Sequence, residues 1–272
     1  MVATAHFTNL APWSLHERTA LITGASQGIG AEVAKLLAAM GARVAVNHFD
    51  DQSNAAQTVE AIRAAGGHAA AFDVDVSRRD VATALVHPVE RQLGTIDVLV
   101  INAARTIYRK LEDMSDDDVD AHVDMNLKAT LRLVNATVSK MAQRRFGRVV
   151  AIGSINQEAP IPILPVYAAL KSAQYTLLRG LARRWSAHGV TFNSVSPGLI
   201  RTSRNEWRRA PGGDWDRLSQ QCSYVGRAGE PAEVAWIVAM MCAPGASYVT
   251  GENVYVAGGA QIPGPRDIGD PL

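Results

Sequence analysis

The stretch that most constrains the fold is a glycine-rich turn near the start of the chain. Thr19-Ala-Leu-Ile-Thr is a short apolar run, Gly24-Ala-Ser-Gln-Gly-Ile-Gly follows at once, and a helical pattern runs from Glu32 to Met40. Glycines permit a tight turn and a close backbone approach, and the free N–H groups and dipole of the helix start favour an anion such as a pyrophosphate. Strand, glycine turn and helix in this order indicate the first βα unit of a dinucleotide-binding sheet.

The rest of the chain continues this alternation. The 272 residues, 47% of them apolar, are enough to bury one large core, so we expect a single α/β domain. The patterns predict further strands at about 43–47, 68–72, 97–101, 148–153, 190–195 and 253–256, and helices at about 52–65, 116–142, 167–188 and 231–242.

Charge and cysteine usage narrow the function. The formal net charge is +1 with both signs interspersed, which argues against nucleic acid or membrane partners and favours a small-molecule substrate. Cys222 and Cys242 have neither disulfide nor metal-ligand spacing, so we predict no metal site and a reducing compartment. Met1 to Leu15 lack a signal-peptide pattern, and no window is apolar enough for a membrane span. These features predict a cytoplasmic protein.

The end of the second strand should face the adenosine ribose of a dinucleotide. An acid there would select the 2′-hydroxyl of NAD, but His48 holds the deciding position, and Asp50 and Asp51 come later, where helix capping is an alternative. Ser26 and Gln27 of the glycine turn offer no base for a 2′-phosphate. Both NAD and NADP therefore stay open as cofactors.

Two later strands end in residues that suit a ligand. After the third strand, Asp75 is positioned to accept from the adenine amino group and Ser77 to cap the next helix, with helix capping by both as an alternative of equal weight. The fourth strand ends in Asn102-Ala-Ala, whose small side chains leave room for a ligand in the crevice of an open sheet.

Tyr167 and Lys171 stand four apart in a run of helical character, so both project from one helix face. Making a Tyr hydroxyl useful at neutral pH requires about three pKa units, or about 4 kcal/mol. A unit charge about 4 Å away at an effective dielectric near 20 supplies about that much. Ser154, just past a buried strand, is placed to polarise a substrate oxygen. Taken alone, such a pair is usually an ordinary surface Lys beside a half-buried Tyr.

Three further segments carry alternatives. Asn126 lies in the middle of the long predicted helix, where a structural hydrogen-bonding role competes with a catalytic one. Ser196-Pro-Gly ends the sixth strand and redirects the backbone across the carboxyl edge of the sheet. The irregular segment at 199–227, with its glycines and Trp207 and Trp215, suggests a lid over the substrate, with an oligomer contact as the alternative.

Residues 1–15 and 261–272 show no sustained pattern. The first segment is interpreted as an N-terminal arm and the second as a proline-rich C-terminal tail, so that residues 16–260 form the domain. Neither segment contains a motif that predicts a function.

Taken together and in order, these pieces resemble the classical short-chain dehydrogenase/reductase family across about residues 15 to 260. The resemblance rests on Thr23-Gly24 with Gly28-Ile29-Gly30, Asn102-Ala103, Asn126, Ser154, Tyr167 with Lys171, Ser196-Pro197-Gly198, and Gly226-Arg-Ala-Gly-Glu-Pro before Thr250-Gly251. It implies a Rossmann-type doubly wound parallel sheet of seven strands with helices on both faces, hydride transfer at a nicotinamide, and a homotetramer or dimer.

The resemblance also implies roles for individual residues. Tyr167 would be the general acid or base, Lys171 would lower its pKa and bind the nicotinamide ribose, Ser154 would orient the substrate, and Asn126 would hold a proton relay. The implied cofactor-binding set is Gly24, Ser26, Gln27, Gly28, Ile29, Gly30, His48, Asp75, Val76, Asn102, Ala103, Tyr167, Lys171, Pro197, Gly198, Ile200 and Thr202.

The sequence departs from the family pattern in three places. The usual Asn-Asn-Ala-Gly is Ile101-Asn102-Ala103-Ala104, a common Asp before the late glycines is Ala257, and a common pair of serines is Gly153-Ser154. The first departure puts the conformation of that turn in question. None of them removes a catalytic group.

The leading hypothesis is an NAD(P)-dependent oxidoreductase that interconverts a secondary alcohol and a ketone. A dinucleotide-binding sensor or scaffold without chemistry is the alternative from another class. Asn156, Gln157 and Glu158 would suit a sugar or polyol, whereas Arg208 and Arg209 would suit the phosphorylated carrier arm of a 3-oxoacyl thioester. The sequence does not decide between these substrates.

Overall fold

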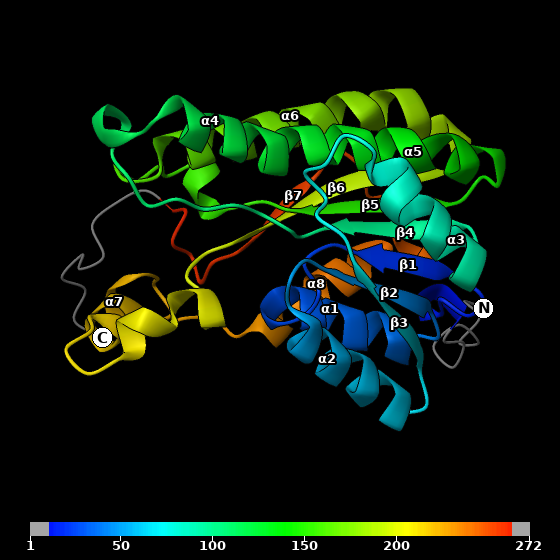
Figure 1. Ribbon diagram of the computed structural model, residues 1–272, viewed down its shortest axis with the longest axis horizontal. Coiled ribbons are helices and arrows are strands. Elements are labelled where there is room, and N and C mark those ends of the chain that lie inside the picture. The colour runs from blue at the N-terminus through cyan, green and yellow to red at the C-terminus, as the bar shows by residue number, and fades with distance from the viewer. Residues whose placement is uncertain (1–10, 263–272) are drawn as a thin grey trace, which may run out of the picture.

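The computed structural model describes residues 11–262, and within them seven parallel strands form one sheet in the order β3-β2-β1-β4-β5-β6-β7 (Figure 1). The strands are β1 Thr19–Ile22, β2 Arg43–His48, β3 His68–Asp73, β4 Ile96–Ile101, β5 Gly147–Ile152, β6 Val190–Pro197 and β7 Asn253–Val256.

The position of β1 in this order creates the binding crevice. β1 pairs with β2 on one side and with β4 on the other, Leu21 lying opposite both Ala45 and Leu99. Connections from β1 and β4 therefore leave in opposite directions, which opens a crevice beyond the carboxyl ends of these strands. The strands β1, β4, β5 and β6 are buried throughout, as expected for a parallel sheet covered on both faces.

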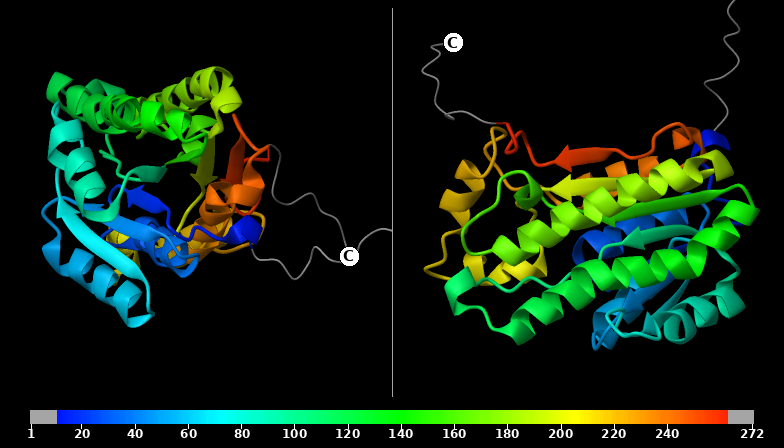
Figure 2. Two further views of the ribbon diagram at one scale, coloured as in Figure 1. Left: turned by 90° about the vertical axis from the view of Figure 1, so that its right-hand side faces the viewer. Right: turned by 90° about the horizontal axis from the view of Figure 1, so that it is seen from above.

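Helices cover both faces of the sheet (Figure 2). One layer contains α1 Gly28–Ala39, α2 Gln52–Ala64 and α8 Pro231–Cys242, which share an apolar core with β1 and β2. The other contains α3 His87–Leu93, α4 Asp116–Val123, α5 Ala129–Gln143 and α6 Pro165–Trp185, and its core includes Leu99, Leu133 and Phe192. The doubly wound fold is confirmed.

The predicted strands and long helices agree with the structure to within a few residues. The sequence analysis missed α3, which follows a π-helical segment Ala82–Val86 and is too short for a clear period. It also treated 199–227 as irregular, whereas this segment contains a 3₁₀ stretch Ser203–Arg209 and the helix α7 Trp215–Gln221. The buried side chain of Trp215 holds α7 in place.

The described chain is already part of the domain before residue 16. A 3₁₀ turn at Ala11–Trp13 packs against Pro244–Ala246, and the fully buried Leu15 donates its N–H to Met40 O at 2.7 Å. The arm and tail predicted at the two ends fall mostly outside the described residues, so their role stays a prediction. Among residues 11–262, no helix has the length and apolar character needed to cross a bilayer.

Candidate active site

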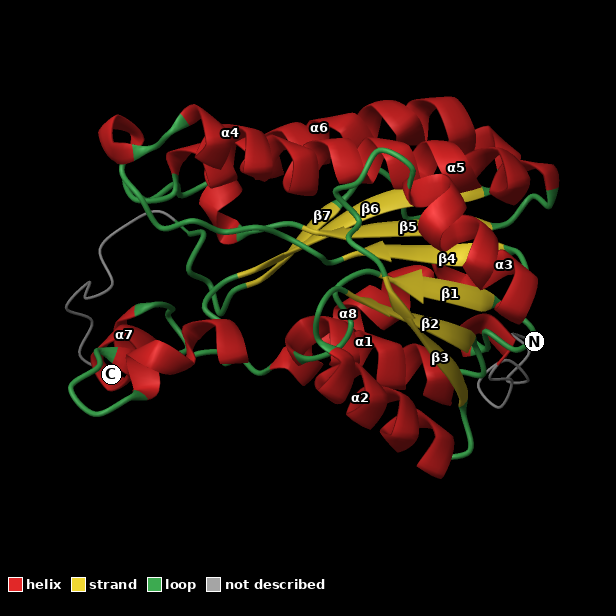
Figure 3. Cartoon of the chain, viewed as in Figure 1, coloured by secondary structure: helices red, strands yellow, loops and turns green. Residues whose placement is uncertain are grey.

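A cleft of about 930 Å³ lies at the carboxyl ends of the strands, on the side to which all the arrows point and where α7 lies (Figure 3). It brings together most of the predicted site residues. Those that line it are Gly24, Ser26, Gln27, Gly28, Ile29, His48, Asp75, Val76, Asn102, Ala103, Ser154, Tyr167, Lys171, Pro197, Gly198, Ile200 and Thr202. Gly30 and Asn126 do not line the cleft.

The glycine turn fits a pyrophosphate. Gly24 and Gly28 both have φ of +61°, which favours glycine, and a Cβ on Gly30 would lie 2.4 Å from Gly24 O and 2.6 Å from Asn102 Nδ2. No side chain caps the start of α1, and its first turn contains no acid, so its N–H groups remain available to an anion. The chain therefore offers the cradle that a dinucleotide requires.

We predict that Gly30→Ala weakens cofactor binding at least about tenfold and lowers the Tm by about 5 °C, because the added methyl has no space at a packed turn. Fluorescence titration with NADPH and NADH measures the first effect and thermal unfolding the second. Gly180→Ala on α6, where a Cβ meets nothing within 4 Å, is the matched control and should bind cofactor normally. Equal behaviour of the two variants would contradict the assignment.

The unusual turn after β4 is hydrogen-bonded to the glycine turn. Asn102 Nδ2 donates to Thr23 O at 3.0 Å and to Gly24 O at 2.7 Å, while Thr23 Oγ1 accepts from the N–H groups of Asn102 and Ala103. Ala104 does not have a positive φ, so the glycine that the family pattern has there is not needed. The question raised by this departure is resolved, since the turn is tied to the glycine turn by four hydrogen bonds.

The end of the cleft beside β2 and β3 contains two carboxylates. Asp51 stands at the N-cap position of α2, but its side chain accepts from Gln27 Nε2 and Asn54 Nδ2 instead of capping the helix, and hydrogen bonding, led by Ser26, lowers its pKa. Asp75 Oδ1 accepts from the N–H and the hydroxyl of Ser77. Ser77 is thus no helix cap, because the next helical segment begins at Ala82. His48 is buried, and neither of its ring nitrogens has a hydrogen-bond partner among the residues that the structure describes.

Tyr167, Lys171 and Ser154 come together where β5 ends beside α6. All three are buried, Lys171 most completely with 2% exposure. Lys171 Nζ donates to Ile152 O at 2.6 Å and to Gln174 Oε1 at 3.3 Å, and lies 5.7 Å from the centre of the Tyr167 ring. Ser154 Oγ accepts from Asn156 N–H at 3.1 Å, and the Ser154 side chain also hydrogen-bonds Tyr167, so both hydroxyls lie at one point of the cleft. A buried triple of this kind excludes the reading as an ordinary surface pair.

Burial has the largest effect on the pKa of both Tyr167 and Lys171. Burial raises the pKa of Tyr167, and the charge of Arg204 and hydrogen bonds of the Ser154 and Thr106 side chains act in the opposite direction. Burial, assisted by the charge of Arg204, lowers the pKa of Lys171 to about 7. The groups that act against the rise in the pKa of Tyr167 are therefore Arg204, Ser154 and Thr106, and the role of Lys171 in lowering that pKa stays a prediction.

Asn126 lies in a π-helical turn, Asp124–Lys128, that joins α4 to α5 within the single long helix predicted at 116–142. Its Oδ1 accepts from Arg105 N–H at 3.1 Å and its Nδ2 donates to Arg105 O at 2.9 Å. Gln174 Nε2 donates to Asn126 O at 3.3 Å, and Gln174 Oε1 accepts from Lys171. A hydrogen-bonded path therefore connects Asn126 to Lys171 through Gln174.

The structure separates residues that the sequence grouped as substrate-binding. In the loop after β5, Asn156 lines the cleft, whereas Gln157 Oε1 accepts from Ser196 Oγ and Glu158 interacts with Tyr255. In the segment 199–227, Arg208 lines the cleft but pairs with Asp214 at 2.8 Å. The remaining arginine of that group, Arg209, donates to Thr202 O and Asn205 Oδ1.

Sequence reasoning missed three residues near the pair. Gln174 had a local signal, since it stands three residues after Lys171 on the same helix. Thr106 and Arg204 line the cleft and act on the pKa of Tyr167, but they are 98 residues apart and meet only in the fold. No short-range pattern could have found them.

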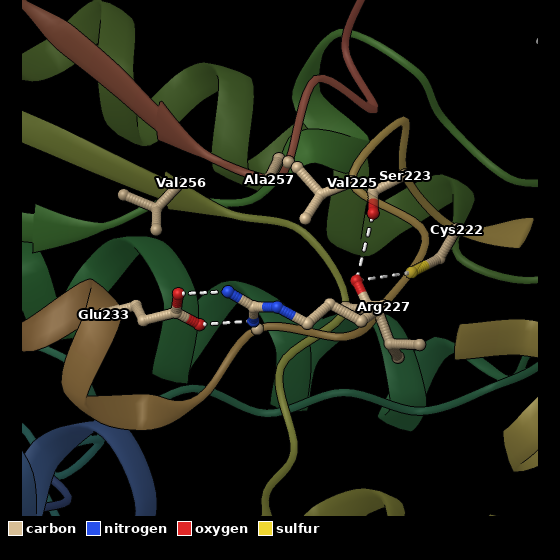
Figure 4. A pocket seen from close by; sticks show the side chains of 10 residues that line it. Cys222, Ser223, Val225, Arg227, Glu233, Val256 and Ala257 are labelled. Atoms are coloured by element: carbon tan, nitrogen blue, oxygen red, sulfur yellow. Dashed lines mark hydrogen bonds and ion pairs between the residues drawn. The ribbon is translucent and has the colours of Figure 1, made fainter. Parts of the chain in front are cut away.

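A second cavity of about 100 Å³ lies beside the cleft, and Figure 4 shows the groups that bound it. Arg227 and Glu233 form a two-pronged ion pair across one side, and Ser223 Oγ donates to Arg227 O. Glu233 also accepts from Glu230 N–H at the start of α8. The Gly226-to-Pro231 motif thus anchors the end of the segment 199–227 to α8 and contains no reacting group.

The glycine turn, the cleft and the buried Tyr–Lys pair define a dinucleotide-binding protein of the Rossmann type with an acid–base site. A family model described as enoyl-(acyl carrier protein) reductase matches residues 24–261. The short-chain reductase protein NovJ of Streptomyces niveus is 37% identical over 247 residues, 89% of this chain and 94% of that protein. The chain belongs to the short-chain dehydrogenase/reductase family.

Solved structures agree with this assignment. A 3-oxoacyl (acyl-carrier-protein) reductase from Agrobacterium tumefaciens with NADP bound has a TM-score of 0.89 and 35% identity, covering 94% of this chain and 100% of that one. A gluconate 5-dehydrogenase from Burkholderia cenocepacia in complex with NADP and tartrate has a TM-score of 0.83 and 29% identity, covering 92% and 98%. The chain is an NAD(P)-dependent oxidoreductase, and the sensor alternative is not favoured.

Proposed function

We propose that this oxidoreductase interconverts a secondary alcohol and a ketone with Tyr167 as general acid or base. The observation that carries the proposal is the burial of Tyr167, Lys171 and Ser154 at the carboxyl end of β5, in the same cleft as the glycine turn. A bound nicotinamide supplies or accepts the hydride. The protein contributes proton transfer at the Tyr167 oxygen and the positioning of the substrate oxygen by Ser154.

The other residues have supporting roles in this proposal. Gly24, Gly28 and the start of α1 bind the pyrophosphate, His48, Asp75 and Val76 border the adenosine, and Pro197 to Thr202 border the nicotinamide. Asn126 and Gln174 connect Lys171 to a path for the proton. The segment 199–227 acts as a lid, supported by its place at the carboxyl edge of the sheet and by Thr202 to Asn205 in the cleft wall.

The function is tested by titration with NADH and NADPH, followed by a panel of ketones and secondary alcohols. We expect binding of at least one cofactor and its oxidation or reduction in the presence of members of the panel. The ratio of the dissociation constants for NADH and NADPH gives the cofactor preference. We expect this ratio to favour NADH, because the negative charge of the Asp51 carboxylate would repel the 2′-phosphate of NADPH. Cofactor binding without absorbance change across the whole panel would instead support the sensor.

Two substrate classes remain within this proposal. A sugar, polyol or derived acid is supported by Asn156 in the cleft wall and by the likeness to a gluconate 5-dehydrogenase. A 3-oxoacyl thioester is supported by the likeness to acyl-carrier-protein reductases. The support from Arg208 is weaker than the sequence suggested, because Asp214 already neutralises its charge.

We also propose a cytoplasmic homotetramer or dimer. Trp236 and Met240 expose apolar surface one turn apart on α8, next to the edge strand β7, and such surfaces mark subunit contacts. Both cysteines are free thiols, as is usual in a reducing compartment.

A further inference from the structure

Arg204 is a cation at the catalytic end of the cleft, and it has no acidic partner within residues 11–262. Arg204 belongs to the 3₁₀ stretch Ser203–Arg209, and its guanidinium reaches across the cleft to the loop after β4. Nη1 donates to Thr106 Oγ1 at 3.1 Å and Nη2 donates to Ala104 O at 3.2 Å. A guanidinium has five N–H donors, so three remain, and both recorded acceptors are neutral.

The neighbouring arginines are used differently. Arg208 pairs with Asp214 and Arg201 with Glu230, whereas no ion pair among the described residues includes Arg204. Of the described residues that line the cleft, only Asp51 and Asp75 are acids, and both lie at the adenosine end, after β2 and β3. The catalytic end therefore has an excess of positive charge.

That charge is close enough to act on the reacting groups. After burial, the positive charge of Arg204 has the largest effect on the pKa of both groups: it opposes the rise in the pKa of Tyr167 and adds to the fall in the pKa of Lys171. The positive charges of Arg204 and Lys171 repel each other beside the buried phenol of Tyr167. An anion bound between them would reduce this repulsion. None of the residues between 11 and 262 that line this end of the cleft is an acid.

We propose that Arg204 binds a carboxylate of the substrate, so that the enzyme acts on hydroxy acids and their oxo acids. This proposal rests on the proposed function and names its substrate class. The planar fork of Arg matches a carboxylate with two parallel hydrogen bonds. Because Thr106 Oγ1 and Ala104 O are neutral acceptors, a carboxylate can displace them, and a single Arg suits a monoanionic group better than a phosphate dianion.

The test compares oxo acids, with one to four carbons between ketone and carboxylate, with their primary amides, which have nearly the same shape and no charge. For at least one pair the wild type should show at least about tenfold higher kcat/KM for the acid. Arg204→Met should remove this preference: kcat/KM for the acid should fall about 30-fold, whereas kcat/KM for the amide should change less than threefold. Arg204→Lys should retain part of it.

Controls separate this role from others. Arg217→Met alters an exposed arginine on α7 that does not line the cleft and should behave as wild type. Calorimetric titration of malonate, which contains no ketone, into the enzyme–NADPH or enzyme–NADH complex should show binding to the wild type and about tenfold weaker binding to Arg204→Met.

Three results would overturn the proposal. The first is an equal kcat/KM for acids and amides. The second is that Arg204→Met weakens cofactor binding in the absence of substrate as much as it lowers turnover. The third is a phosphorylated ketone with a higher kcat/KM than every oxo acid. Turnover of neutral ketones with no preference for acids would leave the proposed function intact. Absence of turnover on every compound would reject both.

Discussion

Tyr167→Phe should lower kcat by about 10³-fold or more while the dissociation constant for the cofactor changes less than twofold. The substitution removes only the hydroxyl that exchanges the proton with the substrate oxygen. The ring keeps its place in α6, which lies against the π-helical turn and the loop after β5. Stopped-flow hydride transfer and fluorescence titration of the cofactor measure the two quantities separately.

Tyr175→Phe is the matched control for this substitution. Tyr175 lies two turns further along α6, and its hydroxyl donates to Gly251 O at 3.2 Å, outside the cleft. It should retain nearly all activity. A Tyr167→Phe enzyme with more than a tenth of wild-type turnover would show that another group moves the proton, and Ser154 would then be the first to examine.

Lys171→Met should reduce kcat by about 10²-fold and also change how stability depends on pH. The ammonium is buried, and the pKa of Lys171 is lowered to about 7 by that burial and by Arg204. In the unfolded chain its pKa is near 10.4. Folding therefore expels a proton from this group between about pH 7 and pH 10.

The sign of the effect follows from proton linkage. In this window the unfolded chain binds more protons than the folded chain, so stability rises with pH. From pH 7 to pH 9 this group should add about 2 kcal/mol to the free energy of unfolding of the cofactor-free wild type. Below pH 7 both states are charged, and the full cost of burying the ammonium remains.

Denaturant unfolding at several pH values tests this prediction. Lys171→Met should lack the rise between pH 7 and pH 9, so the difference between wild type and variant should change by about 2 kcal/mol over that range. Lys35→Met removes an exposed lysine paired with Glu32 and should leave the wild-type dependence unchanged. Parallel curves for wild type and Lys171→Met would mean that Lys171 retains an ordinary pKa in the folded protein.

The sequence determined the architecture and the list of reacting groups that we propose. Both depend on short-range patterns: the glycine turn between β1 and α1, the apolar runs that became the buried strands, and the four-residue spacing of Tyr167 and Lys171 along α6. Each pattern has a local physical cause that tertiary contacts reinforced. The two missed helices, α3 and α7, are both short, and packing instead of a sequence period holds them.

Only the tertiary structure decided the pKa shifts of these groups and the charged residues that lie near them. The direction of the pKa shift of Tyr167 depends on the balance between desolvation and nearby charge, and spacing along the chain gives neither. Arg204 meets Thr106 across 98 residues of sequence, and whether an acid pairs with it, as none does in the described part of the chain, depends on the whole cleft. The types of candidate reacting group could thus be predicted from residues close together in the sequence. The pKa values of these groups and the charge of the cleft depend on residues that only the fold brings together.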